Sequence, residues 1–576
     1  MGDWGKRTVS ELREELRSIG LPASGRKSEL VARIASFDSG QVLETEARKI
    51  AAISPTKTGL MERISDLPIA ALVVSGIVLI GISGSAALYG DDLVKWIRGE
   101  PEYVLIDFDS NQTRAYAQGL VDLGHPEWEG RLSGTEQEEN TAQSIKLNFS
   151  NSGIPATIEE FEIPLFYMGN EFELMICTPG NIGNIFGGPS PCTVADVDRD
   201  EVEFSHREDF VIQGYSGDVD ILASSDVNVI DLGIGNESAA WDSASNGIGL
   251  VWLMDGNDGQ AGTESNTVLL LRAQEKGLRG LITVNARQNC DELVAGDCVP
   301  YFKSLDITQF NEKPYNIGFM MVSKSVGEAI VNQVIDGDGM LQFVVQVDNQ
   351  VNSYIHVPCG ILQGETDSLI VIGAHHDTAY NGQGAVDNTA GAATVQEIAR
   401  QLGLLSSELG PPKLTIYFCT WGGEEEGLWG STEWVKKHRE QLRGNLRLYI
   451  NLDMNHVDAQ RNSGLTLQGN SPADIERIEG IVEAFEGEYQ DLSSKYAISV
   501  RTLDSEEMPN NSDHAPFVYG IGEGENDDYY GKALVCYGSG SSEYHTYLDN
   551  MDRFNEESLI VSGVIFGSLV RHLAWS

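Results

Sequence analysis

The chain has 576 residues, and its 39 Lys and Arg against 86 Asp and Glu give a formal net charge of -47. A chain of this length exceeds one ordinary hydrophobic core, so several domains are expected. The acidic excess repels nucleic-acid phosphates, which excludes the chain as a whole from the basic nucleic-acid-binding proteins and favours a highly soluble surface. Residues 1–66 differ, since they carry 11 Lys and Arg against 10 Asp and Glu.

Residues 8–37 have the pattern of two short helices separated by a turn. Apolar residues recur at helical spacing in each half: Leu12, Leu16 and Ile19, then Leu30, Ile34 and Phe37. The turn at residues 20–27 contains Gly and Pro, which break helices. We assign this helical module to residues 1–45, followed by a linker at residues 46–66.

The module resembles the SAP motif, which is often associated with DNA binding. The resemblance rests mainly on the Gly-Leu-Pro-x-Ser-Gly-x-Lys turn. It implies that Arg26, Lys27 and Arg33 are candidates to contact a nucleic-acid backbone. So few cations bind DNA weakly, and the alternative partner of residues 8–37 is another protein.

Residues 67–90 are long and apolar enough to cross a bilayer. They include no charged residue, and they lie too far along the chain for a cleavable signal peptide. More Lys and Arg lie just before this segment than just after it: Arg48, Lys49, Lys57 and Arg63 against Lys95 and Arg98. By the positive-inside rule, the N-terminus is expected in the cytoplasm and the chain after residue 90 outside it.

Two pairs of cysteines among the seven each bracket a loop. Cys290 and Cys298 bracket a short one, and Cys177 and Cys192 a longer one. Each pair forms a disulfide if this region is extracytoplasmic, and otherwise remains as free thiols.

Four strand-like apolar runs each lead to a side chain that can bind a metal. The runs at residues 369–372, 414–419, 446–452 and 533–537 are followed by His375, Glu424–Glu426, Asp453 and His545 respectively. Ligands of open α/β sheets gather at the carboxyl ends of strands, so these side chains are expected to converge. The sequence therefore predicts a metal site at this edge of a sheet.

Two more acids complete the predicted site. Asp387 precedes a helical pattern, and its two carboxylate oxygens can bridge two metals. Asp377 can hold the second nitrogen of His375, as metal-bound imidazoles require. Two His, two Asp and one Glu suit two zinc ions, which together can activate one water.

The order of these motifs resembles the M28 metallopeptidases, which are co-catalytic zinc exopeptidases. The matching segments are His375-x-Asp377, Gly384-Ala385-x-Asp387-Asn388, Glu424-Glu425-x-Gly427-Leu428-x-Gly430-Ser431, Asn451-Leu452-Asp453 and Tyr544-His545-Thr546. An earlier segment, Gly130-Arg131-Leu132-Ser133-Gly134-Thr135, also resembles the family's opening. The resemblance covers residues of about 109–200 and 350–576.

The resemblance implies a role for each residue of the site. His375 and Asp453 would hold one zinc, Glu425 and His545 the other, and Asp387 would bridge the two. Glu424 would be the general base, which takes a proton from water and returns it to the leaving amine. Tyr544 would help to bind the oxyanion of the reaction.

Two assignments within this set have alternatives. The three consecutive acids leave the register open, and the family spacing to Gly427-Leu428 makes Glu426 the spacer; a shift by one residue would make Glu425 and Glu426 the working pair. His514 could replace His545 as a ligand, although the Tyr-His-Thr context favours His545.

Residues 205–348 interrupt the peptidase with short strands, Gly-rich turns and one helix-like segment. This order is similar to that of a protease-associated (PA) domain, which several M28 members carry at this place. The resemblance implies a lid or a wall that selects substrates. A purely structural insertion is the alternative.

The expected fold is therefore α/β: a mixed β-sheet flanked by helices, of the zinc exopeptidase (phosphorylase/hydrolase-like) type. The peptidase would comprise residues 91–204 and 349–576, with the β-rich PA-like insertion between them. The expected function is that of a membrane-anchored aminopeptidase with two zinc ions, acting on peptide or protein N-termini. Asn511-Ser512-Asp513-His514-Ala515-Pro516-Phe517 resembles a stretch common among M28 aminopeptidases, whereas an M28-type carboxypeptidase and a non-catalytic receptor or scaffold are the alternatives.

Overall fold

The computed structural model describes most of the chain after residue 102. The described residues are 103–180, 199–223, 226–254, 262–287, 296–307, 316–457, 464–522, 529–538 and 543–576, together with Arg7 and Val31. All residues assigned to the expected metal site are among them. The expected membrane helix at residues 67–90, and nearly all of the SAP-like module, lie outside them. Residues Leu105–Phe485 and Gln490–Ser576 form one compact unit.

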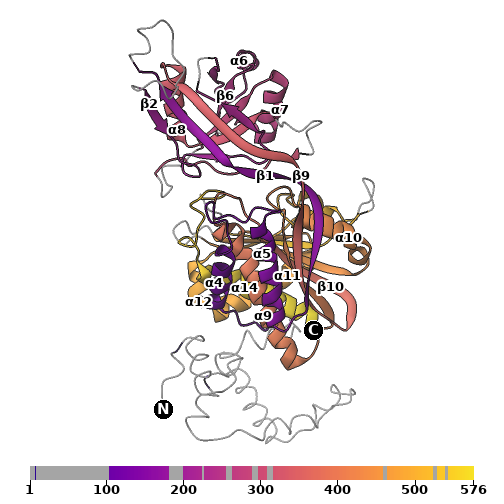
Figure 1. Cartoon of the computed structure of the whole chain (residues 1–576). Coiled ribbons are helices and arrows are strands. Elements are labelled where there is room, and N and C mark those ends of the chain that lie inside the picture. The colour runs from indigo at the N-terminus through magenta and orange to yellow at the C-terminus, as the bar shows by residue number, and fades with distance from the viewer. Residues whose placement is uncertain are drawn as a thin grey trace, which may run out of the picture. The chain divides into compact units, whose positions relative to one another are not determined.

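A large mixed sheet carries the residues of the expected metal site (Figure 1). Its strands are β1 (Ala156–Thr178), β2 (Asp200–Glu203), β4 (Val219–Ile221), β9 (Met340–Leu362), β10 (Thr366–His375), β11 (Leu414–Trp421), β12 (Leu446–Leu452), β13 (Leu465–Gly469), β14 (Ile498–Thr502) and β15 (Ala533–Tyr537). The order is β14-β13-β15-β12-β10-β11-β9-β1-β2, and β4 pairs with β9. The central strands β15, β12, β10 and β11 are parallel, so their carboxyl ends meet at one edge.

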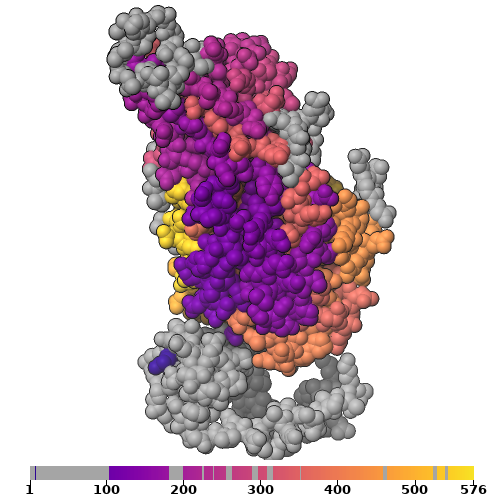
Figure 2. All heavy atoms as spheres, viewed as in Figure 1, coloured from indigo at the N-terminus to yellow at the C-terminus, as the bar shows by residue number. Residues whose placement is uncertain are grey.

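Helices cover both faces of this sheet. One group packs together on one face: α4 (Ser110–Val121), α5 (Glu136–Asn151), α9 (Ala390–Leu409) and α14 (Glu556–Trp575). Figure 2 shows the first two, in indigo, over much of this face. The other group contains α10 (Trp429–Asn445) and α13 (His514–Tyr519). The remaining elements here are α11 (Pro472–Glu488), α12 (Gln490–Lys495) and the turns η6 (Ala385–Thr389) and η7 (Ser505–Glu507).

Local sequence signals explain where several of these elements begin. Asp109 caps α4 by accepting hydrogen bonds from two backbone N–H groups of its first turn. Thr135 caps α5 in the same way through the N–H of Glu138. The apolar runs of β10, β12 and β15 are buried, as expected of parallel strands covered on both faces.

The inserted part has a sheet of its own. Its strands are β3 (Phe210–Ile212), β5 (Val229–Asp231), β6 (Ile248–Leu253), β7 (Gly280–Asn285) and β8 (Gly318–Val322), in the order β3-β8-β7-β6-β5. Its helices are α6 (Ser238–Ser243), α7 (Asn266–Lys276), α8 (Lys324–Ile330) and the turn η5 (Val331–Ile335). The 23-residue strands β1 and β9 pair antiparallel between Ala156–Gly360 and Cys177–Met340, and they link the main sheet to this part (Figure 1).

The fold confirms the predicted mixed sheet flanked by helices. The runs predicted at residues 446–452 and 533–537 coincide with β12 and β15, and the other two lie within β10 and β11. The inserted part contains helices as well as strands. The long β1–β9 pair was not predicted, because it joins segments far apart in the sequence and therefore leaves no local pattern.

The cysteines of the described part are mostly oxidised. Cys359 and Cys419, directly opposite each other on the neighbouring strands β9 and β11, form a disulfide that the sequence did not suggest. Cys177 and Cys298 are disulfide-bonded as well. The other members of the two predicted pairs, Cys192 and Cys290, lie outside the described residues.

One helix of the described part, α14, is long and apolar enough to cross a membrane. However, 72 % of its most apolar window is buried inside the protein. It contacts α4, α9 and β11, so it is a core helix of this compact unit.

Candidate metal centre

Five side chains meet at the carboxyl ends of the parallel strands. His375 ends β10, Glu425 and Asp453 follow β11 and β12, Asp387 lies in the turn η6 before α9, and His545 lies in the loop after β15. Their ligand atoms fall into two groups that share a carboxylate, His375–Asp387–Asp453 and Asp387–Glu425–His545, with all atoms of each group within 4.8 Å of one another. We call these five residues the metal centre.

Asp387 faces both histidines. Its Oδ1 lies 3.1 Å from Nε2 of His375, and its Oδ2 lies 3.2 Å from Nε2 of His545. Nε2 of His545 is also 2.9 Å from Oε2 of Glu425, while Nε2 of His375 is 3.7 Å from Oδ1 of Asp453. The two oxygens of one carboxylate therefore connect two potential ligand groups.

The tautomer of His545 shows that this arrangement suits a cation. Its Nδ1 lies 2.7 Å from the carbonyl oxygen of Phe302, so Nδ1 carries the hydrogen and donates it there. Nε2 then faces the oxygens of Glu425 and Asp387, and it has no hydrogen-bond partner among the described residues. A nitrogen and carboxylate oxygens this close together are stable only with positive charge between them, which either a proton or a metal ion supplies.

The charges of the metal centre support the same conclusion. Burial alone would lower the pKa of His545, but Glu425 and Asp387 outweigh burial and raise that pKa to about 9. Carboxylates likewise overcome burial to raise the pKa of His375 well above its usual range. Burial tends to raise the pKa of Asp387, but the two imidazoles hold it below its usual range. The centre thus attracts positive charge strongly.

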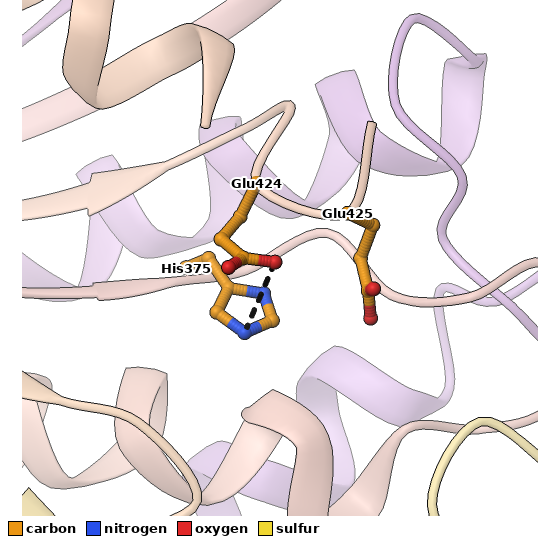
Figure 3. Close-up of side chains that lie close together, drawn as sticks. All are labelled: His375, Glu424 and Glu425. Carbon is orange, nitrogen blue, oxygen red and sulfur yellow. Dashed lines mark ion pairs between the residues drawn. The ribbon is translucent and has the colours of Figure 1, made fainter. Parts of the chain in front are cut away.

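The acids that follow β11 point in different directions. In Figure 3, Glu424 extends toward the imidazole ring of His375, whereas the carboxylate of Glu425 lies apart from that ring. Oε2 of Glu424 is 4.0 Å from Nε2 of His375, and burial, reinforced by Glu425, raises the pKa of Glu424 well above its usual range. Together with His375 they form a third group of potential ligands. Glu426 belongs to none of the three groups found in the described part of the chain.

Comparison with known proteins identifies this part of the chain. Residues 359–570 match the model of peptidase family M28, and residues 3–39 match that of the SAP domain. Residues 359–570 are a peptidase family M28 domain. The SAP-like module predicted from the sequence is confirmed as a SAP domain.

Relatives of the M28 domain are named as peptidases of two kinds. The "Probable glutamate carboxypeptidase LAMP1" of Arabidopsis thaliana is 28 % identical over 276 residues, which are 46 % of this chain and 38 % of that protein. An "Aminopeptidase" of Pseudomonas aeruginosa is 24 % identical over 399 residues, 66 % of each chain. The chain thus spans well under half the length of the Arabidopsis relative.

Solved structures share the fold. The structure titled as BSAP, a zinc aminopeptidase from Bacillus subtilis, superposes with a TM-score of 0.56 at 17 % identity and covers 82 % of this chain and 96 % of that chain. An aminopeptidase from Aneurinibacillus sp. strain AM-1 gives a TM-score of 0.51 at 18 % identity, covering 81 % of this chain and 94 % of that chain.

Asp377 ties the two halves of the metal centre together in the M28 domain. Nδ1 of His375 lies 3.2 Å from the carbonyl oxygen of Asp377 and 3.5 Å from its Oδ1. Oδ2 of Asp377 accepts hydrogen bonds from Oγ of Ser133 at 2.8 Å and from the backbone N–H of Glu425 at 3.1 Å. Asp377 therefore orients the first histidine through its backbone carbonyl and fixes the backbone at Glu425 through its carboxylate.

Two further residues that hold the M28 domain's ligand loops had no assigned role at the sequence level. The buried Arg131 donates to the carbonyl oxygens of His376 and Gln383 and to Oγ1 of Thr389. Arg131 lies in the segment that resembles the family's opening, which was the only signal for it. Asp549 accepts from the backbone N–H groups of residues 386 and 387 at 2.8 and 3.0 Å, and nothing in its local sequence indicated this.

The structure separates His514 from the metal centre. Nε2 of His514 donates to the carbonyl oxygen of Pro509 at 2.6 Å, and burial lowers the pKa of His514 to about 4. It belongs to none of the ligand groups found among the described residues, whereas His545 does.

Tyr544 covers one side of His545. The two rings are stacked, with centroids 3.6 Å apart and an interplanar angle of 18°. Burial and then the nearby carboxylates, Asp387 foremost, raise the pKa of Tyr544 well above its usual range. The phenol therefore keeps its hydrogen and can donate it.

Proposed function

We propose that the M28 domain is an exopeptidase that uses two zinc ions, and that it acts as an aminopeptidase. The observation that carries this proposal is the shared carboxylate of Asp387, which faces an imidazole in each of two ligand groups. In this proposal His375 and Asp453 hold one zinc and Glu425 and His545 the other. The mixed nitrogen and oxygen ligands suit zinc.

Glu424 is the proposed general base. When bound, a pair of zinc ions lowers the pKa of a water and polarises the carbonyl of the scissile bond. Glu424 takes the proton of the attacking water and later gives it to the leaving amine. Tyr544 donates its hydrogen to the developing oxyanion.

The two alternatives to an aminopeptidase are a carboxypeptidase and a non-catalytic scaffold. The relatives named as probable glutamate carboxypeptidases support the first, in which the site would recognise a free carboxylate instead of a free amine. The complete set of ligands and the base argue against a non-catalytic scaffold, which needs none of them. The segment at residues 511–517 supports the aminopeptidase.

A panel of dipeptides and longer peptides tests this function directly. The purified protein, loaded with zinc, should release the first residue of peptides with a free N-terminus, and it should ignore the same peptides once they are acetylated. C-terminal amidation should leave the rates unchanged. Removal of zinc by a chelator should abolish turnover, and added zinc should restore it. Turnover of acetylated but not of amidated peptides would make the enzyme a carboxypeptidase, and no turnover of either would refute the proposed function.

We also propose that the M28 domain lies outside the membrane, anchored by residues 67–90, with the SAP domain in the cytoplasm. The disulfide Cys359–Cys419 and the oxidised Cys177 and Cys298 support an oxidising compartment. The SAP domain would bind DNA or a protein, and the inserted part, residues 205–348, would form a PA-like wall of the active site.

Protease added to intact cells should test this topology. The chain after residue 90 should be degraded, and residues 1–66 should be protected until the cells are permeabilised. An antibody tag at each end reports the two parts separately. Protection of the M28 domain with loss of the N-terminal tag would reverse the orientation.

A further inference from the structure

One segment of the inserted part, residues 302–303, reaches the metal centre. The carbonyl oxygen of Phe302 accepts a hydrogen from Nδ1 of His545 at 2.7 Å, and the backbone N–H of Phe302 donates to the carbonyl oxygen of His545 at 2.9 Å. That carbonyl also accepts from Nδ2 of Asn381 at 3.0 Å. The backbone of His545 has φ of +58°, a conformation that residues other than glycine rarely adopt. These three hydrogen bonds therefore hold a strained residue in place.

The next residue of the segment, Lys303, reaches the phenol of Tyr544. Its Nζ lies 3.1 Å from Oη of Tyr544 and 5.5 Å from the centroid of the ring. Since Tyr544 stacks on His545, the segment contacts both a proposed zinc ligand and the proposed oxyanion donor. The inserted part therefore holds this wall of the site at two adjacent residues.

The chemistry of the two groups fixes the direction of their hydrogen bond. An ammonium group has three donors and no acceptor, so Oη of Tyr544 must be the acceptor. The hydrogen of the phenol cannot point at Lys303, and it remains available for another acceptor. An ammonium group that donates to the phenol oxygen also makes the O–H of that phenol a stronger donor, as in cooperative hydrogen-bond chains.

We propose that Lys303 is a positioning residue that directs the hydroxyl of Tyr544 toward the oxyanion formed at the metal centre. The inference rests on the proposed peptidase function. It makes the inserted part a component of the reaction site, because a group from outside the M28 domain sets the orientation of a donor within it. Lys303 itself touches neither the metal ligands nor, in this inference, the reacting atoms.

A different role for Lys303 would leave a different kinetic pattern. Its side chain is exposed, and an exposed cation can simply attract a substrate carboxylate. Attraction would act on substrate binding, change KM, and depend on the substrate's charge. Direction of the Tyr544 hydroxyl acts only on the transition state, so it changes kcat and leaves KM unaltered.

The test compares Lys303→Met, Lys303→Arg, Tyr544→Phe and the double variant Lys303→Met/Tyr544→Phe in the full-length, zinc-loaded protein. Loss of one oxyanion donor costs about 10²–10³ in kcat, so Tyr544→Phe should fall in this range and Lys303→Met, which acts through it, should lose about tenfold. Lys303→Arg should stay within about threefold of the parent, because its guanidinium also donates only. The double variant should match Tyr544→Phe alone. Lys324→Met, at an exposed lysine of the same inserted part, is the control.

Binding of a phosphinic dipeptide, whose anionic oxygen stands in for the oxyanion, gives a second readout that needs no turnover. Calorimetry should show that Lys303→Met weakens this binding about tenfold in the parent background and not at all with Tyr544→Phe. Zinc content should be the same in all variants. An effect of Lys303→Met that appears in KM alone, or that is equally large with Tyr544→Phe, would overturn the inference. A parent protein that cleaves no peptide would refute the proposed function, and the phosphinic dipeptide would still decide the role of Lys303.

Discussion

Replacing Glu424 with glutamine should abolish most of the turnover and leave the zinc in place. Glutamine keeps the size and the hydrogen-bonding ability of the side chain, but it cannot take a proton from water at neutral pH. General acid–base groups contribute about 10²–10⁴-fold, so kcat should fall by a factor in this range. The zinc should stay, because the proposed ligands are His375, Asp387, Glu425, Asp453 and His545.

The neighbouring substitution Glu425→Gln is the matched control. It changes the same group one residue later, but there it replaces the carboxylate that lies 2.9 Å from Nε2 of His545. A neutral amide binds a cation more weakly than an anion does, so this variant should lose one of its two zinc ions as well as turnover. Zinc per chain, measured by mass spectrometry beside kcat, separates the two. Loss of zinc from Glu424→Gln with retention in Glu425→Gln would shift the register by one residue and make Glu425 and Glu426 the working pair.

The sequence predicted the edge of the sheet where the candidate site lies, because strands leave a periodic apolar pattern. Each run that led to His375, Glu425, Asp453 and His545 is a strand in the structure. Once those strands are parallel and adjacent, their carboxyl ends must lie together. The family resemblance then supplied the choice between His514 and His545, which the strand pattern alone left open.

The sequence did not predict the groups that hold the ligands in position. Asp549 follows its nearest proposed ligand by four residues but supports the turn at Asp387, which is far away in the sequence. Phe302 supports His545 through backbone atoms, and a backbone carbonyl has no signature in the residue type. In the sequence, nothing distinguishes Lys303 from an ordinary surface lysine. The contacts of Phe302 and Lys303 depend on how the inserted part meets the M28 domain, and no local pattern encodes that.

Replacing Asp387 with asparagine should have the widest effect on metal binding of any single substitution in the centre. Its two carboxylate oxygens lie 3.1 and 3.2 Å from the imidazoles of the two ligand groups, so both groups lose a shared anion at once. An amide offers one acceptor oxygen and no charge, and it cannot bridge. The affinity for zinc should therefore fall at both metal positions. Loss of a residue that only supports a ligand typically weakens metal binding about 10–100-fold, and the loss here should be larger.

The stoichiometry of zinc distinguishes this bridging role from a one-sided one. Against a buffered zinc concentration that saturates the parent protein at two ions per chain, Glu425→Gln and Asp453→Asn should each keep one ion, because each belongs to only one of the two groups built around Asp387. Asp387→Asn should keep none and show no peptidase activity, while circular dichroism shows an intact fold. An Asp387→Asn variant that still binds one ion as tightly as Glu425→Gln does would make Asp387 a ligand of a single zinc, because a true bridge cannot be removed from one position and remain at the other.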